Sequence, residues 1–567
     1  MSRTEGKTVD IPSIWSAEGR VLAQASRWGL TGVIYGLLTL CVIYPLAMIF
    51  LAAFTEDGIV AAINEIVSSD RVLVALWNTL LTSVIGVIIA GVLGVSLAWL
   101  VGRTNMPFKR VLDPLNLIPF YLSSVVGAIC WQILASPRSG LLNVWLQPLL
   151  GPGFFNIYTV WGIGFVLGIY YSPYVYLFTL GSLQSMDASL EEASRASGAS
   201  TLQTASRITL PLSSPAILSA WLLVFVSCMG IFGVPIILGL PGRVNTLSTL
   251  MYSYINDYPA NFSVTAVIGT FLFVVTLALT IVQMRVLSKR RFTTITGKGY
   301  KPRTVDLGKW RFAALGANLL YLVLVVGPLV ALLLVSLQDI WTGAFDLARL
   351  TLRNYEIVLF EDMTAKRGLS NSLIIATLGA TIATVVCLLL SLVMQRTRLP
   401  LREGIYPFSM VPVAIPGVVL GVGYLIAVVG TPLYGTLWVI MIAYIINYLP
   451  TGVRNIDSLV QSISHELDES ARTSGASWGK AMTSIIFPIC IPGLVSAWIL
   501  MFVTFIREVS ASMMLFTYGT ETMSIALIRI TETSPWGVAA AFGVLQTVLL
   551  LGCVAILRLI PVGQAKN

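Results

Sequence analysis

Two ionisable residues stand inside a long apolar stretch near the end of the chain, Arg507 and Glu508 in "FIREVSASMMLF". A charge at the depth of a lipid core is costly, and such residues usually face a protein interior or a water-filled cavity. The pair therefore predicts either a place on a solute pathway or a structural role, as a buried ion pair that fixes helix packing or with Arg507 reaching the outer interface. An earlier apolar stretch is interrupted at Gly233 and Pro235, which fits irregular backbone that lines a cavity. These four residues are our candidates for a solute pathway.

The sequence offers little for covalent or metal chemistry. It has one histidine, His465, and six cysteines that show neither metal-ligand spacing nor a disulfide framework. The cysteines are scattered, mostly inside apolar stretches, at Cys41, Cys130, Cys228, Cys387, Cys490 and Cys553. We expect no catalytic residue and no metal site in this chain, and a membrane-embedded enzyme, which would need convergent polar residues, is a weak alternative.

The elements that hold these residues are long and apolar. Of the 567 residues 56% are hydrophobic and 11% are charged, about half the charged share of a soluble protein. Apolar stretches long enough to cross a hydrocarbon core of about 30 Å occur at 28–53, 76–102, 111–135, 157–182, 216–240, 262–286, 311–337, 370–395, 405–430, 433–455, 493–517 and 537–560. Stretches near 20 residues fit helices rather than barrel strands. The predicted fold class is therefore all-α, a polytopic membrane protein with twelve transmembrane helices.

Two constant offsets relate the first part of the chain to the second. From position 184 onward residues match those 277 positions later, and upstream the offset is 293. The matches include residue types that are uncommon in apolar chains, namely Glu192 with Glu469, Arg195 with Arg472, Gly198 with Gly475, Pro211 with Pro488, Asn78 with Asn371, Arg103 with Arg396 and Pro119 with Pro412. Such a repeat predicts two homologous six-helix halves, 28–286 and 311–560. The prolines Pro119 and Pro412 are expected to bend their helices.

Charge predicts the orientation of these helices. Segment 285–311 has nine Lys or Arg and one Asp, whereas 54–70 has four acids and no base. By the positive-inside rule the basic linker 287–310, which we expect to be exposed, lies in the cytoplasm. Counting helices places both termini, 1–27 and 561–567, in the cytoplasm as well. The halves are then parallel repeats, and the net charge of +9 reports topology rather than nucleic-acid binding.

Each half carries the same polar segment in a predicted cytoplasmic loop. Residues 190–215 read "LEEASRASGASTLQTASRITLPLSSP" and residues 467–492 read "LDESARTSGASWGKAMTSIIFPICIP". We expect a short helix, a turn at Gly198 or Gly475 and a second helix, with small residues that allow a partner to approach closely. The alternative is a pair of amphipathic helices lying on lipid, which would need bulky apolar anchors on one face.

Charged pairs and a cap are expected in the first helix of each segment. Glu192 and Arg195 are spaced i, i+3 on one helical face, as are Glu469 and Arg472. Ser189 and Glu192 have the spacing of a capping box.

Both segments resemble the cytoplasmic signature of the permease subunits of ABC importers, E-A-A-x-x-x-G followed after nine residues by I-x-L-P. The first copy has E-A-S-x-x-x-G with I-x-L-P, and the second has E-S-A-x-x-x-G with I-x-F-P. In that family the segment forms coupling helices that dock on ATP-binding subunits, and the resemblance implies the same here. The residues so implied are Glu192, Ala193, Ser194, Arg195, Gly198, Ala199, Ile208 and Pro211, then Glu469, Ser470, Ala471, Arg472, Gly475, Ala476, Ile485 and Pro488.

The same resemblance implies partners for the chain. A Walker A loop, G-x-x-x-x-G-K-[ST], is not found, and the closest stretch, "GASWGKA", is too short between its glycines. ATP and Mg²⁺ would therefore be bound by separate subunits, two copies of which are implied by two docking segments, and this chain would need no cofactor and would not itself be an enzyme. A separate extracytoplasmic binding protein would deliver the solute, and the implied location is the bacterial inner membrane, surrounded by lipid.

Segments 232–249 and 507–515 resemble the iron(III)-type branch of these permeases, in which fused twelve-span chains also occur. The implied function is import by alternating access, with ferric iron as the cargo. Related branches carry polyamines, thiamine, aminoethylphosphonate or sugar phosphates, and these cargoes stay open. A secondary transporter driven by an ion gradient is a different class. It would need a chain of acids or histidines at the membrane centre, where only Glu508 stands.

Overall fold

The computed structural model describes residues 27–54, 56–68, 70–186, 191, 193–194, 196–289 and 304–559. Within these residues every named element is a helix, which confirms the all-α class. The first half contains η1 Thr39–Ile43, α2 Tyr44–Ala53, α3 Glu56–Ser68, α4 Asp70–Arg103, α5 Lys109–Asn116, α6 Ile118–Tyr121, α7 Ser124–Ala135, α8 Leu141–Leu150, α9 Val160–Ser185, α11 Thr201–Thr204, η2 Ala205–Thr209, α12 Leu210–Gly230, α13 Gly233–Gly242, α14 Leu247–Asn256 and α15 Phe262–Lys289.

The second half repeats this order with its own elements. They are α16 Trp310–Ser336, η3 Leu347–Arg349, α17 Arg353–Glu356, η4 Ile357–Glu361, α18 Met363–Arg396, α19 Arg402–Ser409, η5 Val411–Ala414, α20 Gly417–Val428, α21 Leu437–Gln461, α22 Glu466–Thr473, α23 Trp478–Ala481, η6 Met482–Ile486, α24 Phe487–Arg507, α25 Ser512–Leu515, α26 Met523–Thr533 and α27 Trp536–Leu559.

Twelve spans are found if two bent helix pairs each count as one. In the described part of the chain ten helices are long and apolar enough to cross a membrane, and the pairs Lys109–Tyr121 with Ser124–Ala135 and Arg402–Ala414 with Gly417–Val428 bend by 100° and 101°. Pro119 lies just before the first bend and Pro412 just before the second. A bend is therefore present near each predicted proline, although Pro119 itself lies in the first turn of α6, where a missing amide hydrogen costs little.

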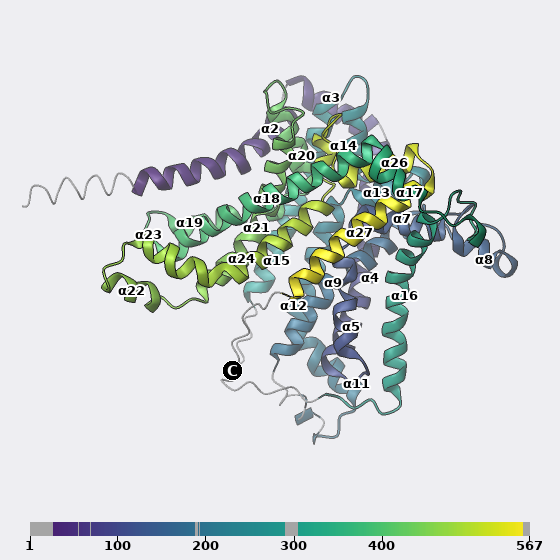
Figure 1. The fold of residues 1–567 in the computed structure, drawn as a ribbon, viewed down its shortest axis with the longest axis horizontal. Coiled ribbons are helices and arrows are strands. Elements are labelled where there is room, and N and C mark those ends of the chain that lie inside the picture. Colours follow the sequence, from purple (N-terminus) through teal and green to yellow (C-terminus); the bar gives the residue numbers. More distant parts are fainter. Residues whose placement is uncertain are drawn as a thin grey trace, which may run out of the picture.

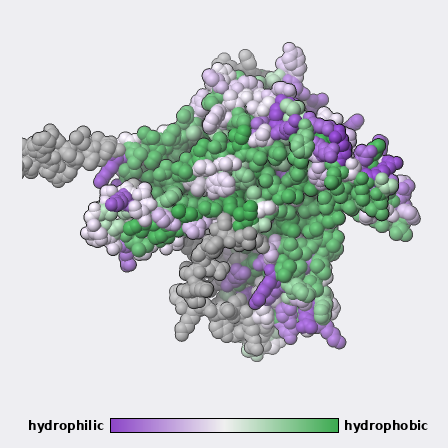
Figure 2. Space-filling view, in the orientation of Figure 1, coloured by the Kyte–Doolittle hydropathy of each residue, from purple (hydrophilic) through white to green (hydrophobic). Residues whose placement is uncertain are grey.

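The outer surface of the helices is apolar, as a lipid environment requires. Figure 2 shows hydrophobic residues over the long helices and hydrophilic residues gathered at the ends of the molecule. Large side chains such as Val323 (63% exposed) and Trp77 (61%) face outward on spanning helices. A helix satisfies its own backbone hydrogen bonds, so such side chains can face hydrocarbon without exposing polar groups.

The two halves form arms that diverge toward the repeated polar segments. In Figure 1 helices α4, α9 and α12 of the first half run to the lower end, where α11 lies, and helices α18, α21 and α24 of the second run to the left end, where α22 and α23 lie. The halves nevertheless interlock, because α2 packs on α20 and α16 packs on α7. The first spanning helix of each half thus contacts the opposite half. A buried hydrogen bond of 2.8 Å from Asn318 to Asn116 joins α16 to the first half.

In each half an asparagine at an equivalent position donates hydrogen bonds to the backbone that follows the broken fifth span. Asn78, in α4, donates to the carbonyl oxygen of Asn245. Its counterpart Asn371, in α18, donates to the carbonyl oxygens of Gly519 and Glu521. The irregular backbone at these places is thereby satisfied by a side chain, which explains why a polar residue recurs here in an apolar helix.

The linker between the halves is partly docked rather than fully exposed. Val305 exchanges backbone hydrogen bonds with Arg103 and Asn105, at the end of α4, and is only 8% exposed. Asp306 accepts a 2.6 Å hydrogen bond from the Asn105 side chain. Within 304–309 the residues Thr304, Asp306, Gly308 and Lys309 are exposed, whereas Val305 is buried and Leu307 is partly buried; 290–303 lie outside the described residues.

Candidate functional site

Both repeated segments turn at a glycine in the left-handed region. Gly198 has φ +86° and Gly475 has φ +87°, and an added Cβ would meet nothing within 4 Å at either position. The amide after each glycine bonds to the carbonyl five residues back, Ala199 to Ser194 at 3.1 Å and Ala476 to Ala471 at 3.0 Å. This is the Schellman ending of a helix, which favours glycine because it has no Cβ penalty. The left-handed backbone conformation thus explains why the motif has glycine at this position. Both turns are exposed.

The serine that follows each turn begins the second short helix. In the first copy Ser200 and Gln203 cap each other, since the Gln203 amide donates to the Ser200 hydroxyl at 3.3 Å and the Ser200 amide donates to the Gln203 side chain at 2.9 Å. In the second copy the Lys480 amide donates to the Ser477 hydroxyl at 3.4 Å. The repeated "SGAS" therefore encodes one helix end and one helix start.

The rest of the motif leads into the fifth span. Ile208 lies in the π-helical turn η2 and Ile485 in its counterpart η6. Pro211 and Pro488 lie in the first turn of α12 and α24, where a missing amide hydrogen costs little.

Several predicted docking residues lie outside the described part of the chain. These are Glu192 and Arg195, the residue Ser189 of the expected capping box, and the side chain of Arg472. The expected i, i+3 charge pairs and the capping box therefore remain predictions. The described residues Ala193, Glu469 and Ser470 are exposed, and Ser194, Ala199, Ala471 and Ala476 are partly buried.

A buried acid in the first segment was missed by the sequence reasoning. Glu191 is 3% exposed, and its carboxylate lies 3.5 Å from the guanidinium of Arg103 at the end of α4. The same carboxylate accepts a 2.8 Å hydrogen bond from Thr209, at the end of η2. One side chain thus ties the repeated segment to two spanning helices. The matched arginines Arg103 and Arg396 were the available signal, but they were interpreted only as part of the internal repeat.

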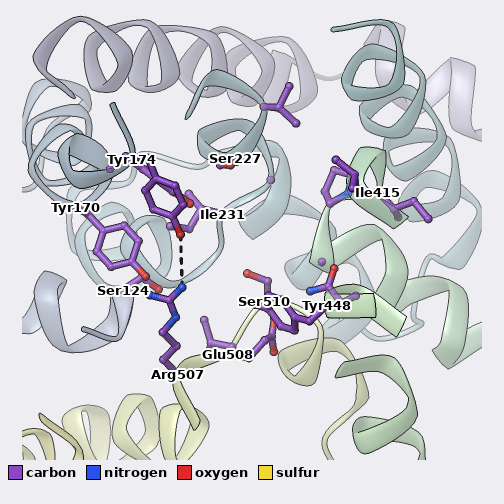
Figure 3. A pocket seen from close by; sticks show the side chains of 18 residues that line it. Ser124, Tyr170, Tyr174, Ser227, Ile231, Ile415, Tyr448, Arg507, Glu508 and Ser510 are labelled. Atoms are coloured by element: carbon purple, nitrogen blue, oxygen red, sulfur yellow. Dashed lines mark hydrogen bonds between the residues drawn. The ribbon is translucent and has the colours of Figure 1, made fainter. Parts of the chain in front are cut away.

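A cavity of about 240 Å³ lies where the two halves meet. Its walls come from both halves, and Figure 3 shows side chains from each pointing toward the centre. The lining residues are Ser124, Tyr170, Tyr171, Tyr174, Val226, Ser227, Gly230, Ile231, Val413, Ile415, Pro416, Gly417, Asn447, Tyr448, Arg507, Glu508, Val509 and Ser510.

The lining follows the internal repeat. At the offset of 277, Tyr171 corresponds to Tyr448 and Gly230 corresponds to Arg507. At the offset of 293, Ser124 corresponds to Gly417. The cavity therefore lies between equivalent places of the two halves, yet its charged residues come from the second half alone.

Arg507 and Glu508 both line this cavity but point to different partners. The Arg507 guanidinium donates to the carbonyl oxygen of Phe120 and, at 3.5 Å, to the hydroxyl of Tyr174, both in the first half (Figure 3). The Glu508 carboxylate accepts from the amides of Ala511 at 2.9 Å and Ser512 at 3.4 Å. Among the described residues no ion pair joins Arg507 to Glu508, so the interpretation as a structural ion pair is not supported.

The remaining pathway candidates lie just behind the cavity. The predicted fifth span 216–240 is broken, with α12 ending at Gly230 and α13 beginning at Gly233. Gly233 and Pro235 are buried and are absent from the lining. An added Cβ at Gly233 would lie 2.3 Å from the Ser124 hydroxyl, so this glycine permits close packing.

The prediction of one continuous span over 493–517 is wrong. Helix α24 ends at Arg507, and the chain continues as an irregular stretch before α25. The start of α25 leaves the backbone amides of Ala511 and Ser512 without partners inside a helix, and the Glu508 carboxylate accepts hydrogen bonds from both. Arg507 can therefore face the cavity while the next residue faces its own backbone.

Two fused helical halves, related by a repeat and enclosing a polar cavity, define a multi-pass membrane transport permease. The chain belongs to the family described as "Binding-protein-dependent transport system inner membrane component", whose model matches residues 90–293 and 388–560. One match falls in each half, as the internal repeat predicts, and identifies the chain as an ABC importer permease, a transport subunit.

Relatives with similar fused chains cover most of this sequence. The "Ferric transport system permease protein FbpB" of Actinobacillus pleuropneumoniae is 26% identical over 93% of this chain and 78% of its own length. A protein of Haemophilus influenzae described as "Putative ferric transport system permease protein FbpB 1" is 26% identical over 85% of this chain and 77% of its own length.

A shorter relative matches less than half of the chain. The "Putative 2-aminoethylphosphonate transport system permease protein PhnV" of Salmonella typhimurium is 25% identical over 42% of this chain and 90% of its own length. Its length corresponds to about one half of the fused chain.

Proposed function

We propose that this chain is the permease of an ATP-driven importer of ferric iron, and that two ATP-binding subunits dock at its two repeated segments. An extracytoplasmic binding protein delivers the cargo, and movement of the docked subunits rocks the two halves so that the cavity opens to alternate sides. Both termini and both repeated segments lie in the cytoplasm. ATP and Mg²⁺ are bound by the partner subunits and not by this chain.

The main support for the docking proposal is the glycine turn that occurs in both repeated segments. It has the same left-handed φ in both copies and is exposed in both. The two turns lie at the ends of different arms (Figure 1), so each of two partner subunits would act on a separate half. Buried contacts such as that between Glu191 and Arg103 support force transfer, because they attach the segment to the spanning helix α4.

The choice of ferric iron is supported by relatives with the same fused architecture, whose printed names describe ferric transport. An alternative cargo is aminoethylphosphonate, which the name of a shorter relative mentions and which the positive charge of Arg507 in the cavity would suit. Polyamines, thiamine and sugar phosphates are further alternatives within the same machinery.

The direct test is uptake by a reconstituted importer. The full chain is placed in liposomes with its ATP-binding subunit inside and its binding protein outside, and ⁵⁵Fe accumulation and ATP hydrolysis are measured together. We expect uptake that requires both ATP and the binding protein. Accumulation driven by an ion gradient without ATP would instead identify a secondary transporter, and aminoethylphosphonate uptake without iron uptake would reassign the cargo.

Docking is tested in the same system with the double variant Gly198→Arg and Gly475→Arg. The space around both positions is open, so the bulky side chains block the approach of a partner without a clash, and the positive φ adds strain to each turn. Gly308→Arg is the matched control, because Gly308 is also exposed, open and at positive φ (+53°) but lies in the linker. Uptake that survives in the double variant would contradict the docking role.

A further inference from the structure

The central cavity holds a positive charge whose partners are neutral. The described contacts of the Arg507 guanidinium are the carbonyl oxygen of Phe120, the hydroxyl of Tyr174 and the face of the Phe120 ring at 5.4 Å. Within the part of the chain that the structure describes, no carboxylate lies within ion-pair distance of this guanidinium. A cation withdrawn from water in this way favours the binding of an anion.

The neighbouring carboxylate is held in place by its own chain. Glu508 is 4% exposed and accepts hydrogen bonds from two backbone amides at the start of α25 and, at 3.4 Å, from the Ser512 hydroxyl. These donors hold the carboxylate toward the start of α25, at the wall of the same cavity. The cavity therefore keeps the positive charge of Arg507 facing its interior.

The opposite wall offers hydroxyl groups. Tyr170 and Tyr174 belong to α9 of the first half, and Figure 3 shows both beside the end of Arg507, with Ser124 next to them. Hydroxyl groups donate hydrogen bonds to oxyanions, and a guanidinium does so with charge assistance. Position 230, the equivalent of Arg507, is a glycine that packs closely on Pro416, so the first half adds no second charge there.

The Tyr170 hydroxyl donates its proton to the carbonyl oxygen of Leu122 at 3.2 Å, which leaves Tyr174 as the tyrosine that donates to a ligand. We infer that the cavity is a binding site for an oxyanion group, held by Arg507 with Tyr174. This inference rests on the proposed function and narrows it, because a bare ferric ion would be repelled by Arg507. Iron would cross as an oxygen-rich anionic chelate, whose carboxylate or phosphate oxygens face the guanidinium. The oxyanion could equally be a free ion, and the experiment separates these two sources.

Equilibrium binding to the purified full chain in lipid nanodiscs tests the site, with [³³P]phosphate alone in one arm and ⁵⁵Fe with excess citrate in the other. We expect saturable binding in at least one arm, weakened about tenfold or more in Arg507→Gln, since a hydrogen bond to a charged group is lost. Arg507→Lys should retain part of the affinity, and Tyr174→Phe should weaken binding severalfold. Binding in the citrate arm alone identifies the chelate as the ligand, whereas binding of phosphate identifies a free anion.

Arg243→Gln is the matched control, because it removes the same charge from an exposed residue outside the cavity. Equal binding by wild type and Arg507→Gln, or no binding in either arm, would overturn the inference. If Arg507→Gln does not fold, the Arg507→Lys and Tyr174→Phe variants decide, and unchanged affinity in both would likewise overturn it. Iron uptake in liposomes that is normal in Arg507→Gln would leave the proposed function standing while the inference fails.

Discussion

Replacing Gly475 with alanine isolates the backbone requirement of the repeated turn. The residue has φ +87° and an added Cβ would meet nothing within 4 Å, so the substitution causes strain without a clash. A non-glycine residue in the left-handed region costs about 1–2 kcal/mol. That cost lowers the population of the native turn relative to a frayed one by a factor of about 5–30.

The assay is ATP hydrolysis stimulated by the loaded binding protein, together with the affinity of the ATP-binding subunit for the permease. We expect Gly475→Ala to weaken both, because the hydrogen bond from Ala476 to Ala471 that shapes the turn becomes less populated. Gly198→Ala should have the same effect, since that turn has φ +86° and equally open surroundings. The double variant should lose more than either single one.

Two matched variants make this prediction refutable. Gly479→Ala introduces the same methyl group four residues later into open space, but on helical backbone where alanine is favoured, so coupling should not fall. Gly475→Asn should recover much of the loss, because asparagine tolerates the left-handed region better than alanine. If Gly475→Ala and Gly479→Ala behave alike, or if asparagine is no better than alanine, the backbone reasoning is refuted.

Three further predictions concern the described contacts. Glu191→Ala should destabilise the chain by about 3–5 kcal/mol by leaving Arg103 buried without this carboxylate; an unchanged thermal unfolding temperature would contradict the role. Asn371→Leu should lower that temperature more than Asn78→Leu, since it removes two hydrogen bonds instead of one. Hydrogen bonds from the amide of Gly308 and the side chain of Asn105 lower the pKa of the Asp306 carboxyl below 3.8. The ionised carboxylate therefore stabilises the docked linker fully above pH 3.8, and this stabilisation is lost as the pH falls through the lowered pKa. Amide exchange of 304–309 should accelerate over that pH range in the wild type, but not in Asp306→Leu, which lacks the contact at any pH.

The sequence by itself was sufficient for the number and approximate places of the membrane spans, the internal repeat and the motif glycines. The membrane spans could be predicted because an uncharged segment of about 20 residues has to make all its backbone hydrogen bonds internally in the lipid core. It therefore forms a helix. The matched pair Gly198 and Gly475 could be found because a left-handed turn selects one residue type, which remains visible at a fixed offset. Bends were also expected at Pro119 and Pro412, and each of these prolines lies shortly before a bend.

Only the tertiary structure decided what surrounds the central charge. In the sequence Tyr170 and Tyr174 are ordinary aromatic residues of an apolar helix, and Arg507 stands more than 300 positions later. Neither local periodicity nor hydropathy states which face of a helix meets the other half, since that depends on how twelve spans interlock. For the same reason the buried position of Glu191 could not be predicted, because its partners Arg103 and Thr209 come from two different elements. A buried charge acquires its role from the groups packed around it, and those groups are brought together by the fold rather than by spacing along the chain.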